Sequence, residues 1–420
     1  MFVLLISVFI LGYIGILFEH QIKLDKAATA LMSGVLCWTI YGLSSPNTST
    51  ILHQLNEHIG EIAGILFFLI GAMTIVELID LYDGFQIIIS RIKTKSKRQL
   101  LLLITLFTFV LSAILDNLTT AIVMSSLVVK IVSSRNDRLL LIGMIVIAAN
   151  AGGAWSPIGD VTTTMLWIGG QITAIGIIKS ILLPSIVAAL IPMLIFMRSL
   201  HGEFIMKEQI QQESIHRTDQ QIIFFSGIGL LLFVPIFKSI THLPPFMGML
   251  LAVGIVWAIS ETLHKKRHKQ SNSPSSIFNA LERIDMPSIL FFLGILLSVS
   301  SLQASGILQQ GANWLQSAIP NNTAMLSGIG VLSAIFDNVP LVAAIQGMFP
   351  LEQYPSNHFF WNYLAFCSGT GGSILIIGSA AGVAAMGIEK INFFWYLRTI
   401  SLPALLGFIA GALVCIYLNG

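Results

Sequence analysis

The sequence predicts an all-α, polytopic membrane protein in which one structural unit occurs twice in opposite orientations. Of its 420 residues, 55% are hydrophobic and only 10% are charged, whereas a soluble domain carries about 25% charged residues. Its apolar stretches approach the roughly 20 residues that a helix needs to span a bilayer, and they are too long for barrel strands. A short phrase also occurs twice, as LSAILDNLTTAI at 111–122 and LSAIFDNVPLVAAI at 332–345. We expect about ten spanning helices, two re-entrant hairpins and two broken helices.

Apolar segments follow one another along the whole chain. They fall near 2–18, 27–43, 59–80, 100–132, 138–178, 181–197, 222–239, 246–263, 287–302, 324–349, 359–388 and 392–417. The first segment has no basic leader and no small-residue cleavage site, so we expect it to be retained as a helix. The three cysteines show no paired spacing, so we expect neither disulfides nor a metal site from them.

Basic residues between the segments predict the topology. They are Lys23, Lys26, Arg91, Lys93, Lys95, Lys97, Arg98, Arg135, Arg138, Arg198, Lys207, Arg217 and the HKKRHK run at 264–269. The positive-inside rule assigns all of them to the cytoplasmic side and the N-terminus to the outside. Topology also explains HKKRHK better than a nucleic-acid partner, which we do not expect.

The segment 100–132 has basic residues at both ends, so both ends should be cytoplasmic. As one helix its 33 residues would extend about 50 Å, beyond a hydrocarbon core of about 30 Å. We therefore expect a re-entrant hairpin with LDNLT at its tip, and cysteines at positions 97 and 135 should label from one side. A single tilted helix, the alternative, requires one basic flank outside.

The second copy of the phrase has the opposite orientation. No Lys or Arg occurs between Leu302 and Glu389, so the flanks of 324–349 should be external. ILFF at 65–68 and 289–292, the two Asp-Asn pairs, and the Gly-rich stretches at 150–160 and 369–379 recur at offsets of 224, 221 and 219 residues. Inverted repeats of this kind are common in transporters.

The repeat predicts how the chain divides. We expect N-terminal scaffold helices at 1–58 and cytoplasmic loops with linking helices at 198–286. The first repeat occupies 59–197, with its hairpin at 100–132 and a broken helix at 138–178. The second occupies 287–420, with its hairpin at 324–349 and a broken helix at 359–388.

The Gly-rich stretches carry side chains that could bind a cation. NAGGAWSPIGD contains Asn150 and Asp160, and Thr162 and Thr163 follow it; GTGGSILIIGS contains Ser373 and Ser379. Carbonyl groups freed at a helix break, together with such oxygen atoms, suit a hard cation. Helix packing and kinking are the alternative role for these glycines.

Three aspartates indicate the charge of the ligand. Asp116, Asp160 and Asp337 should converge near the midplane, and their motifs contain no Lys or Arg. Ionisable residues inside a membrane are costly, so they mark functional sites by default. Burial raises the pKa of a carboxylic acid and a nearby cation lowers it, so a cation and protons would compete for one site. The alternative role is structural, above all for Asp160, which precedes VTTT as an N-cap would.

The same motifs add Asn117 and Asn338 as partners of the hairpin aspartates. Thr119, Glu77 and Ser379 are secondary candidates; Glu77 could serve as a proton relay beside the first hairpin. We expect no catalytic residues and no cofactor, only a transported ion such as Na⁺ at the cation site.

These motifs resemble those of NhaD-type sodium/proton antiporters, a family of the ion transporter superfamily. The likeness covers most of the chain, and GGAWSPIGDVTT is its most specific element. The resemblance implies Na⁺ or Li⁺ efflux driven by proton entry across a bacterial inner membrane. It also implies a homodimer, and a transport domain that moves against a scaffold like an elevator. Its ligand set would be Asp116, Asn117, Asn150, Asp160, Thr162, Thr163, Asp337, Asn338 and Ser373.

Two alternatives stay open at this point. Arsenite or organic-anion transport occurs in the same superfamily, but it needs no acidic hairpin tips. An intramembrane aspartyl protease also needs two embedded aspartates, but IGD at 158–160 lacks the glycine spacing of those enzymes, and the repeat would be unexplained. The sequence does not choose between Na⁺, Li⁺ and K⁺ or between the two half-sites.

Overall fold

The computed structural model describes residues 2–44, 48–89, 94, 96–203, 217–267 and 277–419. Within these ranges the chain forms helices and no β-strand, apart from an isolated bridge between Ser96 and Glu203. Nine of the described helices are long and apolar enough to cross a membrane, which confirms the predicted class. Basic residues that lie outside the described part are Arg91, Lys93, Lys95, Lys207 and the end of the HKKRHK run at 268–269.

The helices fall into four groups along the chain. The N-terminal group contains α1 (Phe2–Leu17), α2 (Glu19–Ile22), α3 (Lys26–Ser44), α4 (Thr48–Leu81) and α5 (Gln86–Ile89). The first hairpin and broken helix contain α6 (Lys97–Leu115), α7 (Asn117–Ile131), α8 (Arg135–Ala154) and α9 (Val161–Ile168), followed by α10 (Ala174–Ser199). The linking group contains α11 (Arg217–Thr241), α12 (Pro245–Arg267) and α13 (Ile277–Arg283). The last group contains α14 (Met286–Ala304), α15 (Ile307–Ala318), α16 (Asn322–Leu332), α17 (Asn338–Met348), α18 (Phe359–Gly371), α19 (Ala380–Glu389), α20 (Phe393–Thr399) and α21 (Ser401–Asn419).

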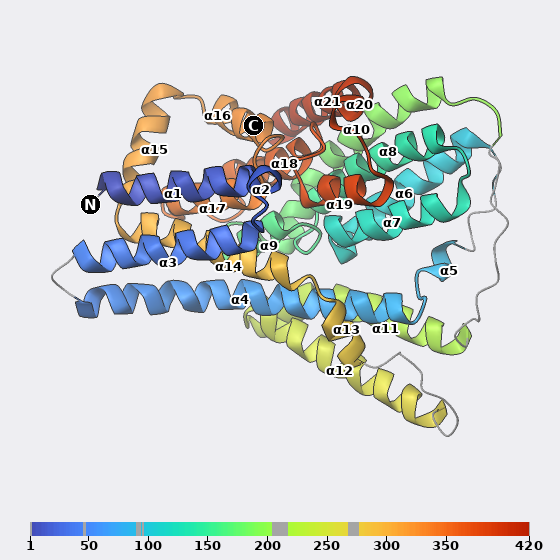
Figure 1. The fold of residues 1–420 in the computed structure, drawn as a ribbon, viewed down its shortest axis with the longest axis horizontal. Coiled ribbons are helices and arrows are strands. Elements are labelled where there is room, and N and C mark those ends of the chain that lie inside the picture. The colour runs from blue at the N-terminus through green and yellow to red at the C-terminus, as the bar shows by residue number, and fades with distance from the viewer. Residues whose placement is uncertain are drawn as a thin grey trace.

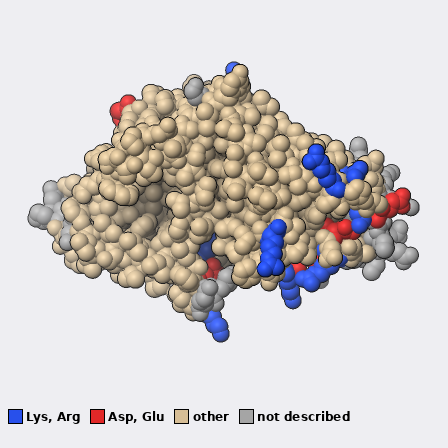
Figure 2. Space-filling model, turned by 90° about the horizontal axis from the view of Figure 1, so that it is seen from above, with Lys and Arg blue, Asp and Glu red and all other residues tan. Residues whose placement is uncertain are grey.

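The two hairpins lie toward opposite ends of the molecule. In Figure 1, α6 and α7 lie toward the right, whereas α16 and α17 lie toward the left, on the same side as the N-terminus. Most of the Lys and Arg visible in Figure 2 lie on the right half of the face shown, toward the end that carries α6–α8. The charge asymmetry therefore distinguishes the two ends.

Each hairpin returns to the end where it began. Lys97, at the start of α6, lies 2.8 Å from Oδ2 of Asp137, in the first turn of α8, and the whole of α7 lies between them in sequence. At the second hairpin, Asn322 Nδ2 donates to the Tyr354 hydroxyl over 2.8 Å, across α16 and α17. That the hairpins are re-entrant in a bilayer stays a prediction.

The repeated residues make repeated contacts. Ser112 and Ser333, each from an LSAI sequence, donate to carbonyl oxygens of the following broken helix, at Ala149 and Ser368. Gly152 and Gly371 occupy matching places, since a Cβ on either would collide with the backbone of the neighbouring hairpin helix. The absence of a side chain thus lets each hairpin approach its broken helix closely.

The two repeats also exchange partners. α7 of the first hairpin packs against α19, while α17 of the second packs against α9. Each returning hairpin helix therefore rests on the second half of the other repeat's broken helix. Arg138 of α8 joins the repeats further, because its guanidinium donates to Glu389 Oε1 over 2.6 and 2.9 Å.

Two predicted boundaries differ from the structure. The first broken helix ends at Ile168 rather than near 178, because Gly170 has φ +82°, a conformation that favours glycine, and Thr173 then caps a new helix, α10. The predicted segment 392–417 is divided between α20 and α21 at Ile400.

Candidate cation site

Asp160 is the centre of the site. It is 1% exposed and caps α9, with its Oδ1 accepting from the backbone N–H and the hydroxyl of Thr162, both over 2.8 Å. The Thr163 hydroxyl donates to the Asp160 carbonyl oxygen over 2.9 Å. Capping by Asp is ordinary at a helix N-terminus, and the dipole of α9 stabilises a negative charge there.

Both hairpin tips point an amide at this one carboxylate. Asn117 Nδ2 donates to Asp160 Oδ2 over 2.6 Å, and Asn338 Nδ2 lies 3.5 Å from both oxygens of Asp160. Asn117 Nδ2 also approaches Asn150 Oδ1 at 3.1 Å, and Asn150 Nδ2 donates to Ser379 Oγ over 2.9 Å. The network thus joins both hairpins and both broken helices.

Asp116 forms the tip of the first hairpin in an unusual conformation. Its φ of 117° lies in a region that residues other than glycine rarely adopt. Thr119 holds the carboxylate, with its backbone N–H on Oδ1 and its hydroxyl on Oδ2, both over 2.7 Å. Such strain costs about 1–3 kcal/mol and concentrates at functional sites.

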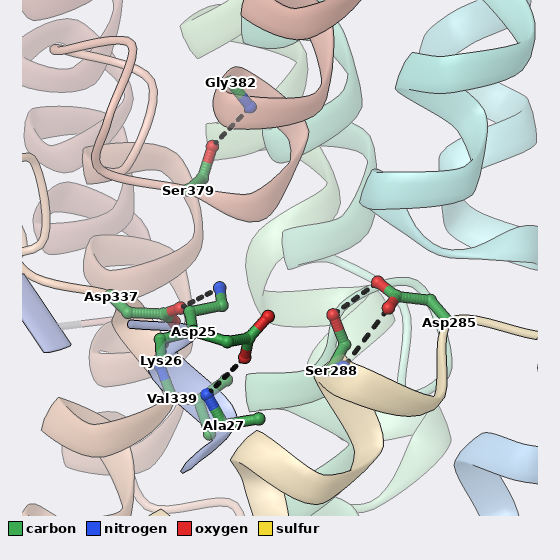
Figure 3. Close-up of polar contacts among 9 residues, drawn as sticks. All are labelled: Asp25, Lys26, Ala27, Asp285, Ser288, Asp337, Val339, Ser379 and Gly382. Carbon is green, nitrogen blue, oxygen red and sulfur yellow. Dashed lines mark hydrogen bonds and ion pairs between the residues drawn. The ribbon is translucent and has the colours of Figure 1, made fainter. Parts of the chain in front are cut away.

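Asp337 occupies the second hairpin tip and caps α17 through the Val339 N–H, at 3.2 Å. Its Oδ2 lies 4.0 Å from Nζ of Lys26, the first residue of α3. Figure 3 shows Lys26 and Asp337 side by side, with Asp25 next to them. The topology prediction placed Lys26 among the cytoplasmic loop residues, whereas the structure brings its ammonium to 4.0 Å from the Asp337 carboxylate. A basic side chain from outside the aspartate motifs therefore lies at the site.

One small cavity connects these groups. It has a volume of about 40 Å³, and its lining includes Asp116, Asn117, Asp160, Asp337, Asn338 and Lys26. A cavity of this size holds one dehydrated or partly hydrated ion, because a single water needs about 10–15 Å³. Drug-sized ligands occupy about 300–1,000 Å³. Among the described residues, including those that line this cavity, no group of three His, Cys, Asp or Glu side chains is arranged to hold a metal ion.

A larger cavity adjoins the small one. Its volume is about 490 Å³, and both cavities are lined by Met73 and Leu118. Its lining includes Thr119, Glu77, Asp80, Asp83 and Asp285, together with Lys130 and Arg283. Thr119 therefore faces this cavity while it holds the Asp116 carboxylate.

The structure brings most of the predicted site residues together, with one exception. Asn150, Thr162, Thr163 and Ser379 line neither cavity, but hydrogen bonds join them to the network around Asp160. Ser373 also lines neither cavity, and its hydroxyl donates instead to the Thr370 carbonyl oxygen at the end of α18 over 2.6 Å. Glu77 lines the larger cavity only, so it lies on the approach to the site.

Sequence reasoning missed Lys26. The short connection between the first two apolar segments carries Glu19, Lys23, Asp25 and Lys26, and loop charge alone assigns it to an aqueous surface. The one available signal was the abrupt change from Asp25-Lys26 to an apolar helix without a longer polar linker.

Comparisons with known proteins agree with this architecture. A family model described as "Citrate transporter" (CitMHS) matches residues 13–362. A crystal structure of the YdaH transporter of Alcanivorax borkumensis superimposes with a TM-score of 0.58 at 14% identity, over 90% of this chain and 91% of that one, which shows a shared fold. The fold and the site therefore define a polytopic membrane transporter.

Proteins of similar sequence show which kind of membrane transporter this is. "Sodium/proton antiporter 1" of Arabidopsis thaliana is 47% identical over 96% of this chain and 70% of its own length. "Na(+)/H(+) antiporter NhaD" of Alkalimonas amylolytica is 29% identical over 99% of this chain and 90% of its own. The chain belongs to the CitMHS family and, within it, to the sodium/proton antiporters, so the NhaD resemblance is confirmed.

Proposed function

We propose that this protein exports Na⁺ or Li⁺ in exchange for protons by alternating access, with cation and protons competing for Asp116, Asp160 and Asp337. The observation that carries the proposal is the convergence of both hairpin tips on Asp160, since Asn117 and Asn338 reach the same carboxylate. The relatives named as sodium/proton antiporters support the same exchange.

The site favours a cation by charge and by size. Three carboxylates and one ammonium group line the small cavity, so the lining is net negative with the carboxylates ionised. Oxygen atoms from carboxylates, amides and hydroxyls are the ligands that hard cations prefer. Without a cation, protons can neutralise the same carboxylates.

The larger cavity supports a route to the site from one side. Basic residues gather toward the end that carries α6–α8, and the positive-inside rule makes that end cytoplasmic and the N-terminus external. Glu77, Asp80 and Asp83 would then attract cations into an inward-facing vestibule that ends at Thr119 and Asp116.

Two groups of helices support an elevator-like exchange. α1, α3 and α14 pack together, as do α4, α11 and α12, while the hairpins pack on the broken helices. In the proposal these six helices form the scaffold, and the hairpins move together with the broken helices. A homodimer and a bacterial cytoplasmic membrane follow from the resemblance and stay predictions.

Citrate is the second candidate substrate, because the family model is named for it. A tricarboxylate would face three carboxylates in a cavity of about 40 Å³, far below the usual size of a small-molecule pocket. The same argument from charge counts against organic anions in general, while arsenite export would leave the acidic tips unused.

The test is proton movement in inside-out vesicles. Added Na⁺ or Li⁺ should collapse an imposed pH gradient in the wild type, and citrate should not. Asp116→Asn and Asp337→Asn should each abolish the response while the protein still inserts. Wild-type exchange in either variant would refute the site assignment, and a response to citrate alone would favour the second candidate.

A further inference from the structure

A lysine shares the cavity with the three carboxylates. Lys26 Nζ lies 4.0 Å from Asp337 Oδ2 and 4.6 Å from the centre of the Phe291 ring. Both partners are partly shielded, with side-chain exposures of 28% for Lys26 and 21% for Asp337. Among the described residues that line this cavity, Lys26 is the only basic one.

Local packing fixes the place from which Lys26 reaches the site. Asp25 caps α3, because its Oδ1 accepts from the Ala27 N–H over 2.7 Å. Further along, α3 lies close against α14, since a Cβ on Gly34 would stand 2.7 Å from the Gly294 carbonyl oxygen. The start of α3 lies beside the second hairpin tip, as Figure 3 shows for Asp25 and Lys26 next to Asp337.

The side chain itself stays adaptable. Its ammonium is a compact charge on a flexible four-carbon stem. Because Nζ lies 4.0 Å from Asp337 Oδ2, the ammonium is attracted to the carboxylate without a close hydrogen bond. It can therefore withdraw from Asp337 without a change in the helix that carries it.

A transported cation would bind the Asp337 carboxylate, whose negative charge the Lys26 ammonium balances in this structure. The cavity of about 40 Å³ lies beside the Lys26 side chain and has room for one ion, so the ammonium and a bound cation would compete for the charge of Asp337 rather than for space. Two like charges a few ångströms apart in a partly desolvated site also repel each other.

We infer that Lys26 is a tethered competitor of the transported cation, an inference that rests on the proposed function. In the empty site its ammonium neutralises Asp337, and a bound Na⁺ or Li⁺ displaces it from that carboxylate. Lys26 thereby lowers the affinity for the cation and reduces the net charge of the empty site.

The experiment compares Lys26→Met with Lys26→Arg at one fixed pH in inside-out vesicles. The measurement is the Na⁺ concentration that gives half-maximal proton movement. Lys26→Met should lower it about three- to tenfold, the range expected for loss of a partly shielded ion pair. Lys26→Arg should raise it, because a guanidinium can bind a carboxylate through two hydrogen bonds. The control Lys23→Gln, exposed on the same connection, should leave it unchanged.

Each outcome decides the inference. An active wild type with an unchanged half-saturating Na⁺ concentration in Lys26→Met would overturn it and leave the proposed function intact. If Lys26→Met does not insert, an unchanged value in Lys26→Arg would overturn it in the same way. A fall in melting temperature without a change in that value would show a purely structural ion pair and also overturn it. If the wild type showed no Na⁺-dependent proton movement, both the proposed antiport and the proposed competition by Lys26 would be refuted.

Discussion

The two half-sites share a backbone and differ in charge. Asp160 and Ser379 cap the second halves of the two broken helices with almost the same conformation, φ −146° and ψ 147° against φ −145° and ψ 152°. Each side-chain oxygen accepts from the N–H of its own helix, at Thr162 or Gly382. Duplication has thus preserved the geometry of the cap, while only one copy carries a carboxylate.

The hairpin tips differ in a related way. A single strained residue, Asp116, separates α6 from α7, whereas residues 333–337 separate α16 from α17. Asp116 is held within its own hairpin by Thr119, but Asp337 is paired with Lys26 from α3. The first half therefore supplies most of the uncompensated charge, and the second supplies a neutralised carboxylate and a donor amide.

Of the variants that compare the two half-sites, those of the two helix caps should have the largest effect. Asp160→Asn should reduce Na⁺-dependent exchange by at least about 100-fold, because a charge about 4 Å from a bound cation contributes about 4 kcal/mol at an effective dielectric of about 20. The matched variant Ser379→Ala removes the other cap and should cost less than about tenfold. Equal losses in the vesicle assay would show that the half-sites are equivalent.

Exchanging the two caps should not restore the site. In the double variant Asp160→Ser/Ser379→Asp the carboxylate leaves the position to which Asn117 and Asn338 both point. We therefore expect exchange as low as in Asp160→Ser alone. Recovery of Na⁺-dependent proton movement would contradict the asymmetry and make the halves interchangeable.

The two tip asparagines should rank by their distance to Asp160. Asn117→Ala removes a bond of 2.6 Å to a charged group and should reduce exchange by about 10- to 100-fold. Asn338→Ala removes contacts of 3.5 Å, at the limit of a hydrogen bond, and should cost no more than about threefold. The reverse order would mean that the second hairpin closes on Asp160 when the ion binds.

The smallest effect on transport is expected from the single cysteine substitutions that test the topology. Lys97→Cys and Arg135→Cys should react with an impermeant maleimide from one side, because the two positions lie at one end of the first hairpin. Asn321→Cys and Gln353→Cys, exposed near the ends of the second hairpin, should react from the other side. Labelling of all four positions from one side would contradict the prediction that the two repeats are inverted.

The sequence predicted what depends on local residues and on periodic repetition. Apolar length, the LSAI phrase and the Gly-rich breaks led to the helix breaks at Asp116 and near Asp337 and to the cap at Asp160. They could not show that both asparagines reach one carboxylate, because that depends on how the repeats cross. Ser373, predicted from its place in a motif, donates to the Thr370 carbonyl oxygen at the end of α18.

Lys26 shows a second limit. The positive-inside rule counts charges in loops but does not measure how deep a short connection reaches. The position of Lys26 beside Asp337 depends on the packing of α3 on α14, where Gly34 and Gly294 each lie against the backbone of the other helix. Packing between segments so far apart in the chain cannot be predicted from a local stretch of sequence.

The exchange of partners between the repeats has a consequence for how such a chain could arise. Because α7 rests on α19 and α17 rests on α9, neither repeat alone would cover the second half of its own broken helix. A single-repeat ancestor would have needed two copies inserted in opposite directions to build one site. Fusion of the copies would then have fixed their orientations and allowed Asp160 and Ser379 to diverge, which two identical chains could not do.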